Sequence, residues 1–239
     1  MNDVGNGVGR FDRDGFAVFE QVIPIPQCGA LAAELTSRFQ SQQDTSRTRI
    51  GGVRNLLQSC KLVADVAVSA PIKSILGSAL GVDAFPVRSI FFDKTPDSNW
   101  TVGWHQDVHV AVAEKIETPG FGPWTVKAGV PHVQPPVEFL NDIVTLRLHL
   151  DHCDQSNGAL KVIPGSHADR ILVDAEFDRW KQRTAVICEV PKGGVMLMRP
   201  LLLHASSPAV RPAHRRVLHI EYATKNLPNG LRWYERTSH

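Results

Sequence analysis

The sequence has little that would mark a nucleic-acid-binding or membrane protein. Its 26 basic and 24 acidic residues leave a formal net charge of only +2, whereas a nucleic-acid-binding domain usually carries a clustered basic excess. The apolar runs, such as 195–198 and 201–203, are short compared with the roughly 20 residues that cross a bilayer. We therefore expect neither a nucleic-acid partner nor a membrane association.

Cysteines are also few, and no two of them form a CxxC pair. This excludes the common zinc-knuckle and thioredoxin-type motifs. Residues 1–14 are polar and glycine-rich, without the apolar stretch of a secretory signal. We therefore expect a cytoplasmic protein with reduced, buried thiols. The thiols are those of Cys28, Cys60, Cys153 and Cys188.

The remaining composition is that of an ordinary globular protein, with 43% hydrophobic and 21% charged residues. No repeat or linker divides the chain, so we expect a single domain over residues 1–239. Its first part, residues 1–83, is predicted to be mostly helical after a short strand at 15–22, because apolar residues recur at three- and four-residue steps. The helical stripes consist of Cys28, Leu31, Leu35 and Phe39, of Leu56, Cys60, Val63 and Ala67, and of Ile72, Ile75, Leu76 and Leu80.

From residue 84 the pattern changes to short apolar segments separated by Pro, Gly and Asn-Gly turns. Such segments predict strands, and Asn157-Gly158 predicts a hairpin between two of them. The predicted strands cover 87–93, 143–151, 159–163, 185–190, 195–199 and 215–222. Many short strands with flanking helices indicate a mainly β fold, either a sandwich or a jelly roll.

The segment 114–136 is an exception, because five prolines and three glycines leave little room for regular structure. It also contains Phe121 and Trp124. A long loop inside a compact domain is usually functional or disordered. The aromatic residues favour a lid that closes over a pocket, and a disordered insertion is the alternative.

The segment His105-Gln106-Asp107 is the first candidate for chemistry. On a strand, residues i and i+2 share a face about 6.6 Å apart, so His105 and Asp107 could reach one metal ion. His109 lies on the same face but about 13 Å from His105, which makes it a poor ligand. His204 follows an apolar run at a predicted strand end and could supply the second imidazole. Two histidines and a carboxylate are the ligands of non-haem Fe(II) oxygenases.

Arg215 lies 11 residues after His204, at the start of the last predicted strand. If His204 ends one strand and Arg215 begins its hairpin partner, the two residues are neighbours. The guanidinium could then bind one carboxylate of 2-oxoglutarate while the keto-acid end chelates the metal. Arg216 would point to the opposite face. The alternative is that Arg215 is a solvated surface charge.

The predicted strand 143–151 has one aliphatic and one polar face. Its polar face is either the wall of a pocket or exposed to solvent, as on any half-buried antiparallel strand. The residues of this face are Thr145, Arg147, His149 and Asp151, and those of the aliphatic face are Val144, Leu146, Leu148 and Leu150.

Together, these motifs resemble the phytanoyl-CoA dioxygenase family of Fe(II)/2-oxoglutarate oxygenases. The resemblance depends on FDRDGF at 11–16, DKTP at 93–96, His105-Gln106-Asp107, Leu150-Asp151, NGALKVIPGSH at 157–167, and then His204, Ser206 and Arg215. It implies a double-stranded β-helix, a cupin-like jelly roll, formed by residues 84–239. Residues 1–83 would support it, and 114–136 would be the candidate lid.

The resemblance also implies roles for single residues. Fe(II) would be bound by His105, Asp107 and His204, and 2-oxoglutarate by Arg215, Ser206 and Thr145. The partners would be O2 and a small-molecule substrate, which is hydroxylated with release of succinate and CO2. Because Asp107 leaves no ligand position for halide, hydroxylation is favoured over halogenation.

The substrate is not specified by these motifs. Arg147 occupies a position where relatives often carry an aromatic residue, and it could contact either the substrate or 2-oxoglutarate. An anionic substrate is favoured if the basic side chains face the pocket. The candidate substrate contacts are Arg147, Arg88, Lys94 and Trp124. Two alternatives remain: a cupin-like metalloenzyme that does not use 2-oxoglutarate, and a non-catalytic ligand-binding barrel.

Overall fold

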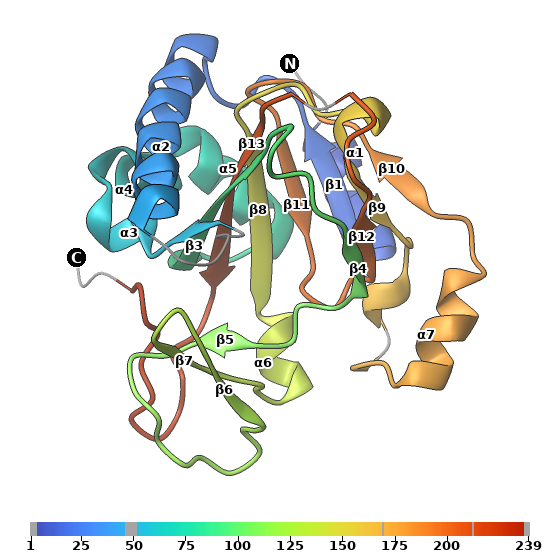
Figure 1. Ribbon diagram of the computed structural model, residues 1–239. Helices are drawn as coiled ribbons and strands as arrows, with labels where there is room; N and C mark the ends of the chain where they lie inside the picture. The colour runs from blue at the N-terminus through green and yellow to red at the C-terminus, as the bar shows by residue number, and fades with distance from the viewer. Residues whose placement is uncertain (1–3, 46–51, 169, 212, 237–239) are drawn as a thin grey trace.

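Antiparallel strands form two larger sheets and one small sheet in the computed structural model, which describes residues 4–45, 52–168, 170–211 and 213–236 (Figure 1). The large sheet has the strand order β1-β11-β8-β13-β3-β2, and the second sheet β10-β9-β12-β4. The strands of the large sheet are, in that order, Phe16–Phe19, Val195–Met198, Ile143–His149, Arg215–Ala223, Phe85–Lys94 and Val53–Arg54. Those of the second sheet are Val186–Cys188, Leu160–Val162, His204–Ser206 and Val102–His105.

Helices α2 to α5 cover one face of the large sheet (Figure 1). The predicted apolar stripes are confirmed, because Leu35, Val63 and Ile72 are buried in one cluster with Leu146 and Ile220 of the sheet. The helices are α1 (Val4–Asp14), α2 (Ile25–Thr45), α3 (Leu56–Ser59), α4 (Lys61–Ala67), α5 (Ala70–Leu80), α6 (Val137–Asn141) and α7 (Asp174–Lys181). Among the described residues, no single helix is long and apolar enough to cross a membrane. Helices α4 and α5 reach the necessary length and apolar composition only when taken together, and they are bent by 44° relative to each other.

Helix α1 is not predicted by the sequence, because three glycines within residues 4–14 lower the helix propensity. In the structure, its Phe11 is fully buried and belongs to the same core cluster as the other helices. Burial of an apolar side chain therefore stabilises a helix that local propensity disfavours.

The space between the two larger sheets differs from one side to the other. On the side of β1 and β11, it is filled by apolar residues such as Leu160, Val162, Met196 and Met198. On the side of β13, β3 and β2, it contains a polar cavity. The predicted mainly β fold with flanking helices is confirmed. All four cysteines are free and buried, as expected.

Asn157-Gly158 does not form the predicted hairpin. Asp154 instead caps a 3-10 turn (Gln155–Asn157) by accepting hydrogen bonds from the backbone N–H groups of Ser156 and Asn157. Gly158 ends the turn with a φ of 86°, a conformation that glycine adopts without strain. Because β8 and β9 belong to different sheets, this segment leads from one sheet to the other.

The segment 114–136 is more regular than the sequence predicts. Strands β6 (Trp124–Lys127) and β7 (Val130–Val133) form a hairpin, and β5 (Val110–Ala111) pairs with β7 to complete the small sheet. The expectation that this segment holds little regular structure was wrong, because most of its prolines flank the strands. The two strands of the hairpin are joined at Ala128-Gly129. Both residues have a positive φ, of 50° and 77°, as in a two-residue hairpin turn.

Candidate active site

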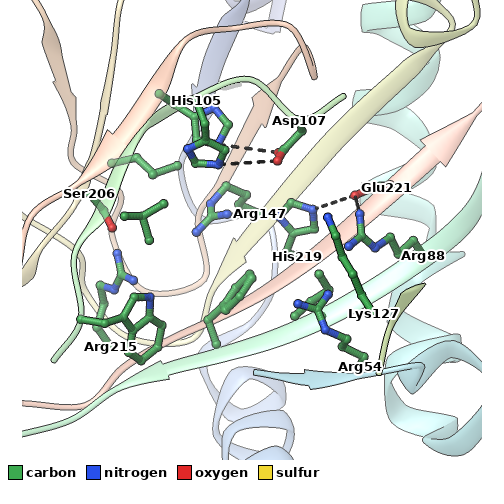
Figure 2. Close-up of a pocket in the computed structure, with 16 residues that line it drawn as sticks. Arg54, Arg88, His105, Asp107, Lys127, Arg147, Ser206, Arg215, His219 and Glu221 are labelled. Carbon is green, nitrogen blue, oxygen red and sulfur yellow. Dashed lines mark hydrogen bonds and ion pairs between the residues drawn. The ribbon is translucent and has the colours of Figure 1, made fainter. Parts of the chain in front are cut away.

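The cavity between the sheets has a volume of about 260 Å³, just below the range of about 300–1,000 Å³ for small-molecule pockets. Part of its wall is apolar. The apolar lining residues are Ile90, Phe92, Trp100, Val102 and Leu160. The rest is strongly polar and contains arginine, histidine and carboxylate side chains (Figure 2). The dimensions and lining fit a small, charged ligand.

Three of the predicted site residues lie together at this cavity. One ligand atom from each of His105, Asp107 and His204 lies within 4.8 Å of the others. The Nε2 atoms of His105 and His204 are each 3.6 Å from a carboxylate oxygen of Asp107. His109 is not part of this cluster.

Strand pairing explains why the two imidazoles meet. His105 is the last residue of β4, His204 is the first residue of β12, and the two are directly opposite each other in the antiparallel pair. Their ring centroids are 4.1 Å apart. Asp107, in contrast, lies beyond the end of β4, so the expectation that it shares a strand face with His105 was wrong.

The position of Asp107 is set by the loop that follows β4. Its backbone N–H donates to the carbonyl of Pro200 at 2.9 Å. The neighbouring Gln106 is buried; its amide donates to the carbonyl of Leu201 at 2.8 Å and accepts from the N–H of Leu172 at 2.8 Å. The bonds to Pro200 and Leu201 join this loop to the segment just before β12. The loop that carries Asp107 is therefore fixed next to the strand that begins with His204.

The backbone also sets the tautomer of both histidines. Nδ1 of His105 lies 2.8 Å from the carbonyl of Gly103, and Nδ1 of His204 lies 2.8 Å from the carbonyl of Leu202. Since a carbonyl oxygen only accepts hydrogen bonds, each Nδ1 carries the proton and each Nε2 keeps its lone pair. Both lone pairs are therefore available on the side where Asp107 lies, as metal coordination requires.

The charges at the cluster suit the same chemistry. Burial lowers the pKa of His204 to about 4, against the opposing influence of Asp107. Burial acts to raise the pKa of Asp107, but the positive charge of His204, His219 and His105 outweighs it and lowers that pKa to about 2. At neutral pH this leaves an ionised carboxylate beside a neutral imidazole, the protonation states that bind metals. The donor set therefore fits a divalent metal ion.

Arg215 and Ser206 line one end of the cavity (Figure 2). Arg215 is buried and donates to the carbonyl of Gly158 through Nη1, while its Nε has no hydrogen-bond partner in the described structure. The two residues reach the cavity from different sheets, so the predicted hairpin between His204 and Arg215 does not exist. Arg215 and Ser206 reach one cavity because their two sheets face each other.

Lys94 lies at this same end, although it does not line the cavity in the described structure. Its Nζ donates to Oγ of Ser206 at 3.2 Å and to the carbonyl of Ser207 at 2.7 Å. Burial and the nearby Arg215 lower its pKa to about 8. The structure thus groups Lys94 with Ser206 and Arg215, rather than with Arg88 as the sequence suggested.

A chain of polar contacts crosses the floor of the cavity. Nη1 of Arg147 lies 3.1 Å from Nδ1 of His219, and because a guanidinium only donates, His219 must accept there and carry its proton on Nε2. That Nε2 lies 3.3 Å from Oε1 of Glu221, which also pairs with Arg88 at 2.7 Å. The polar face of β8 is therefore buried, and Arg147 contributes to the pocket wall.

Two more cations line the cavity, and the sequence analysis did not find them. They are Arg54 of β2 and Lys127 of the β6–β7 hairpin, both close to Arg88 (Figure 2). Neither had a motif that could have marked it. His219 and Glu221 were missed as well, although the alternation of β13 places them on the same face as Arg215, which was a usable signal.

Two of the expected contacts lie elsewhere. Trp124 does not line the cavity in the described structure. Instead, Nζ of Lys115 lies over its ring, 5.6 Å from the ring centre. Thr145 is buried, without a hydrogen-bond partner for its hydroxyl among the described residues, and is also absent from the cavity wall. The opposite face predicted for Arg216 agrees with its contact with Thr36 of α2 at 3.4 Å.

A comparison of the sequence with protein-family models identifies this combination of fold and residues. The model for phytanoyl-CoA dioxygenase matches residues 11–217. The chain belongs to the phytanoyl-CoA dioxygenase family. The resemblance noted from the sequence motifs is thereby confirmed, and no curated protein sequence matches the chain.

Solved structures show the same fold as this member of the phytanoyl-CoA dioxygenase family. AviO1 from Streptomyces viridochromogenes Tue57 matches with a TM-score of 0.68 and 22% identity over 96% of this chain and 98% of that chain. EctD from S. alaskensis with bound Fe matches with a TM-score of 0.71 and 17% identity, over 94% and 79%. The epimerase SnoN in complex with Fe3+, alpha ketoglutarate and nogalamycin RO matches with a TM-score of 0.71 and 15% identity, over 92% and 83%. The predicted double-stranded β-helix is confirmed.

Proposed function

We propose that the protein is an Fe(II)/2-oxoglutarate-dependent hydroxylase of a small organic substrate. In this reaction a C–H bond, O2 and 2-oxoglutarate are converted to C–OH, succinate and CO2. The observation that carries the proposal is the convergence of His105, Asp107 and His204, with both imidazole Nδ1 atoms held by backbone carbonyls. The membership of the phytanoyl-CoA dioxygenase family and the solved relatives with iron and alpha ketoglutarate support it.

In this proposal the three converging side chains hold the iron, which supplies the redox centre where O2 and 2-oxoglutarate react. The carbonyls of Gly103 and Leu202 keep the two imidazoles oriented. Gln106 keeps the carboxylate in place by joining its loop to the segment before β12. Supporting hydrogen bonds of this kind typically contribute tenfold to a hundredfold to metal affinity.

The second carboxylate of 2-oxoglutarate is assigned to Arg215, assisted by Ser206. Arg215 is buried, has an Nε without a partner in the described structure, and lines the cavity. A buried guanidinium without a carboxylate partner is stabilised by a bound anion. Arg147, whose pKa burial and Arg215 lower to about 10, is a second such cation, so this part of the cavity suits a ligand with two negative charges.

The reaction class follows from the donor set as well as from the family. Asp107 occupies the position that a halide ligand would need, which favours hydroxylation over halogenation. SnoN is described as an epimerase, so the same fold supports another outcome. A product that has gained one oxygen atom, seen by mass spectrometry, supports hydroxylation, whereas a product of unchanged mass indicates epimerisation.

The test is succinate release from 2-oxoglutarate in air with Fe(II) and ascorbate, before any substrate is known. We expect slow release by the wild type, background release by His105→Ala, and near wild-type release by the matched control His109→Ala. His109 is in the same segment but outside the cluster. An anaerobic titration for the weak visible band of an Fe(II)–2-oxoglutarate chelate accompanies the assay. A wild type that shows neither succinate nor the band contradicts the proposal. Iron binding without 2-oxoglutarate binding then indicates the cupin-like alternative, and binding of neither indicates the non-catalytic barrel.

A further inference from the structure

Three cations from three separate elements meet at the end of the cavity opposite Arg215 and Ser206. They are Arg54 of β2, Arg88 of β3 and Lys127 of β6, and in Figure 2 their side chains approach one another beside Glu221. We refer to these three residues as the cation trio. None of the three binds the metal ion or 2-oxoglutarate in the proposed reaction.

The charges of the cation trio are poorly compensated. Glu221 is the carboxylate at this end of the cavity, and it already pairs with Arg88 at 2.7 Å and with His219 at 3.3 Å. Nη1 of Arg54 is buried and has no hydrogen-bond partner within the described ranges. Lys127 belongs to none of the ion pairs among the described residues. About two positive charges are therefore left without a counterion.

Burial and the nearby like charges both disfavour the protonated forms of Arg54 and Lys127. Burial lowers the pKa of Arg54, and the nearby Arg88 lowers it further. Lys127 is exposed as a whole residue, but partial desolvation of its side chain, together with Arg88 and Arg54, likewise lowers its pKa. Like charges gathered in a partly buried site destabilise the protein unless an anion binds among them. The arrangement is therefore what a site for an anionic ligand requires.

Strand β3 shows that this is a different site from the one assigned to 2-oxoglutarate. Arg88, Ile90, Phe92 and Lys94 alternate along one face of β3, with Arg88 in the cation trio and Lys94 beside Ser206. The six residue steps from Arg88 to Lys94 span about 20 Å along an extended strand, with the apolar Ile90 and Phe92 between the two ends. One molecule of 2-oxoglutarate is too short to occupy both ends.

We propose that the cation trio binds a doubly charged oxyanion group of the substrate, either a phosphate monoester or a pair of carboxylates. This inference rests on the proposed function, since it identifies the substrate class of that same cavity. The carbon skeleton of the substrate would lie along Ile90 and Phe92, below the three converging metal-site residues. Arginine forks suit such oxyanions because they donate two parallel hydrogen bonds, and Lys127 adds a charge on a flexible stem.

Binding of small probes to the anaerobic Fe(II)–2-oxoglutarate complex tests the inference by calorimetry. The probes are inorganic phosphate, malonate as the dicarboxylate, and acetate as the singly charged control. We expect phosphate or malonate to bind the wild type, acetate to bind at least tenfold more weakly, and salt to weaken the binding. Preference for phosphate or for malonate distinguishes the two sources of the charge. Failure of both doubly charged probes to bind the wild type overturns the inference.

Variants then locate the binding. Arg54→Gln and Lys127→Met should each weaken binding of the preferred probe at least tenfold, and Arg54→Lys should restore part of it. The matched control Lys115→Met should bind as the wild type does, because Lys115 is in the same 114–136 segment but pairs with Glu117 at 2.8 Å. Equal probe affinity in the wild type, Arg54→Gln and Lys127→Met would overturn the inference.

The visible Fe(II)–2-oxoglutarate band separates this inference from the proposed function. Variants of the cation trio should keep the band at wild-type 2-oxoglutarate concentrations, which also shows that they are folded. If they lose 2-oxoglutarate affinity instead, the cation trio belongs to the 2-oxoglutarate site and the inference is wrong. If the wild type itself lacks the band, the proposed function fails, and the probes are then titrated into the metal-free protein.

Discussion

The two ends of the cavity carry similar charge but differ in how firmly that charge is held. At one end, Lys94 and Arg215 are buried and donate to Ser206, Ser207 and the carbonyl of Gly158. At the other end, Arg54 has an unpartnered Nη1 within the described residues, and the Lys127 side chain projects from an exposed hairpin. Pre-positioned donors favour one ligand of constant shape, because little ordering is needed when it binds. The less constrained end is suited to the ligand that gives the protein its specificity.

The two ends of the cavity are separate binding sites only if Arg215 is the residue that binds 2-oxoglutarate. Arg215→Gln should weaken 2-oxoglutarate binding at least 100-fold, since loss of one partner from a buried charge pair costs about 2–5 kcal/mol. The anaerobic band measures this. Phosphate or malonate binding to the metal-free variant should match that of the wild-type metal-free protein. A similar loss at both ends would show that the two groups of cations form one site.

A second prediction concerns Glu235, whose hydrogen bonds hold the backbone next to Arg54 and Arg88. Glu235 accepts hydrogen bonds from the N–H and hydroxyl of Ser89 and from the N–H of Leu57, three residues after Arg54. Burial raises the pKa of Glu235 to about 7, although these hydrogen bonds oppose the shift. Because the folded pKa lies above the unfolded one, the native state binds the extra proton, and its stabilising contribution is lost as pH rises through the folded pKa.

Urea unfolding at a series of pH values checks this prediction. Between about pH 5 and about pH 7, the free energy of unfolding of the wild type should fall by about 2 kcal/mol relative to Glu235→Gln. The 2-oxoglutarate end should not respond, so the visible band should be the same in both proteins. Parallel pH profiles of stability would show that Glu235 is ionised throughout this range and is held by its hydrogen bonds alone.

The smallest change in affinity is expected from a substitution that alters the charge at one end of the cavity only. Glu221→Gln removes the carboxylate that pairs with Arg88 while keeping the size of the side chain. The affinity for inorganic phosphate or malonate should rise about threefold, or about 0.6 kcal/mol, because the largely buried Arg88 guanidinium loses its carboxylate partner and can then pair with the bound anion. Affinity for 2-oxoglutarate should stay constant. Weaker binding of the probes would mean that Glu221 positions Arg88 more than it neutralises it.

The metal-site residues could be predicted from the sequence, but two of the expected local arrangements were wrong. His105, Asp107 and His204 do converge, yet Asp107 lies beyond its strand and His204 is not joined to Arg215 by a hairpin. The imidazoles meet because β4 and β12 are paired with His105 opposite His204. Pairing between strands so far apart in the sequence leaves no local signal.

At the end of the cavity that carries the cation trio, the sequence predicts some residues and misses others. Arg88, His219 and Glu221 lie on strands that the sequence predicts. Strand alternation could therefore have placed all three on the cavity face, although only Arg88 was named as a candidate. Arg54 and Lys127 lie on a two-residue strand and on a hairpin within the segment predicted to be a loop. Their approach to the cavity depends on where those short elements pack.

Local periodicity and short motifs were enough to predict the helical and β-rich parts, the family and the residue types of the metal site. That two groups of cations lie at opposite ends of one cavity became clear only from the folded structure. It also decided that Lys94 belongs with Arg215 and Ser206, and that Trp124 is remote from the cavity. The reason is physical: charge and hydrogen bonding act through space, and the distances between these side chains follow from the way two sheets pack face to face.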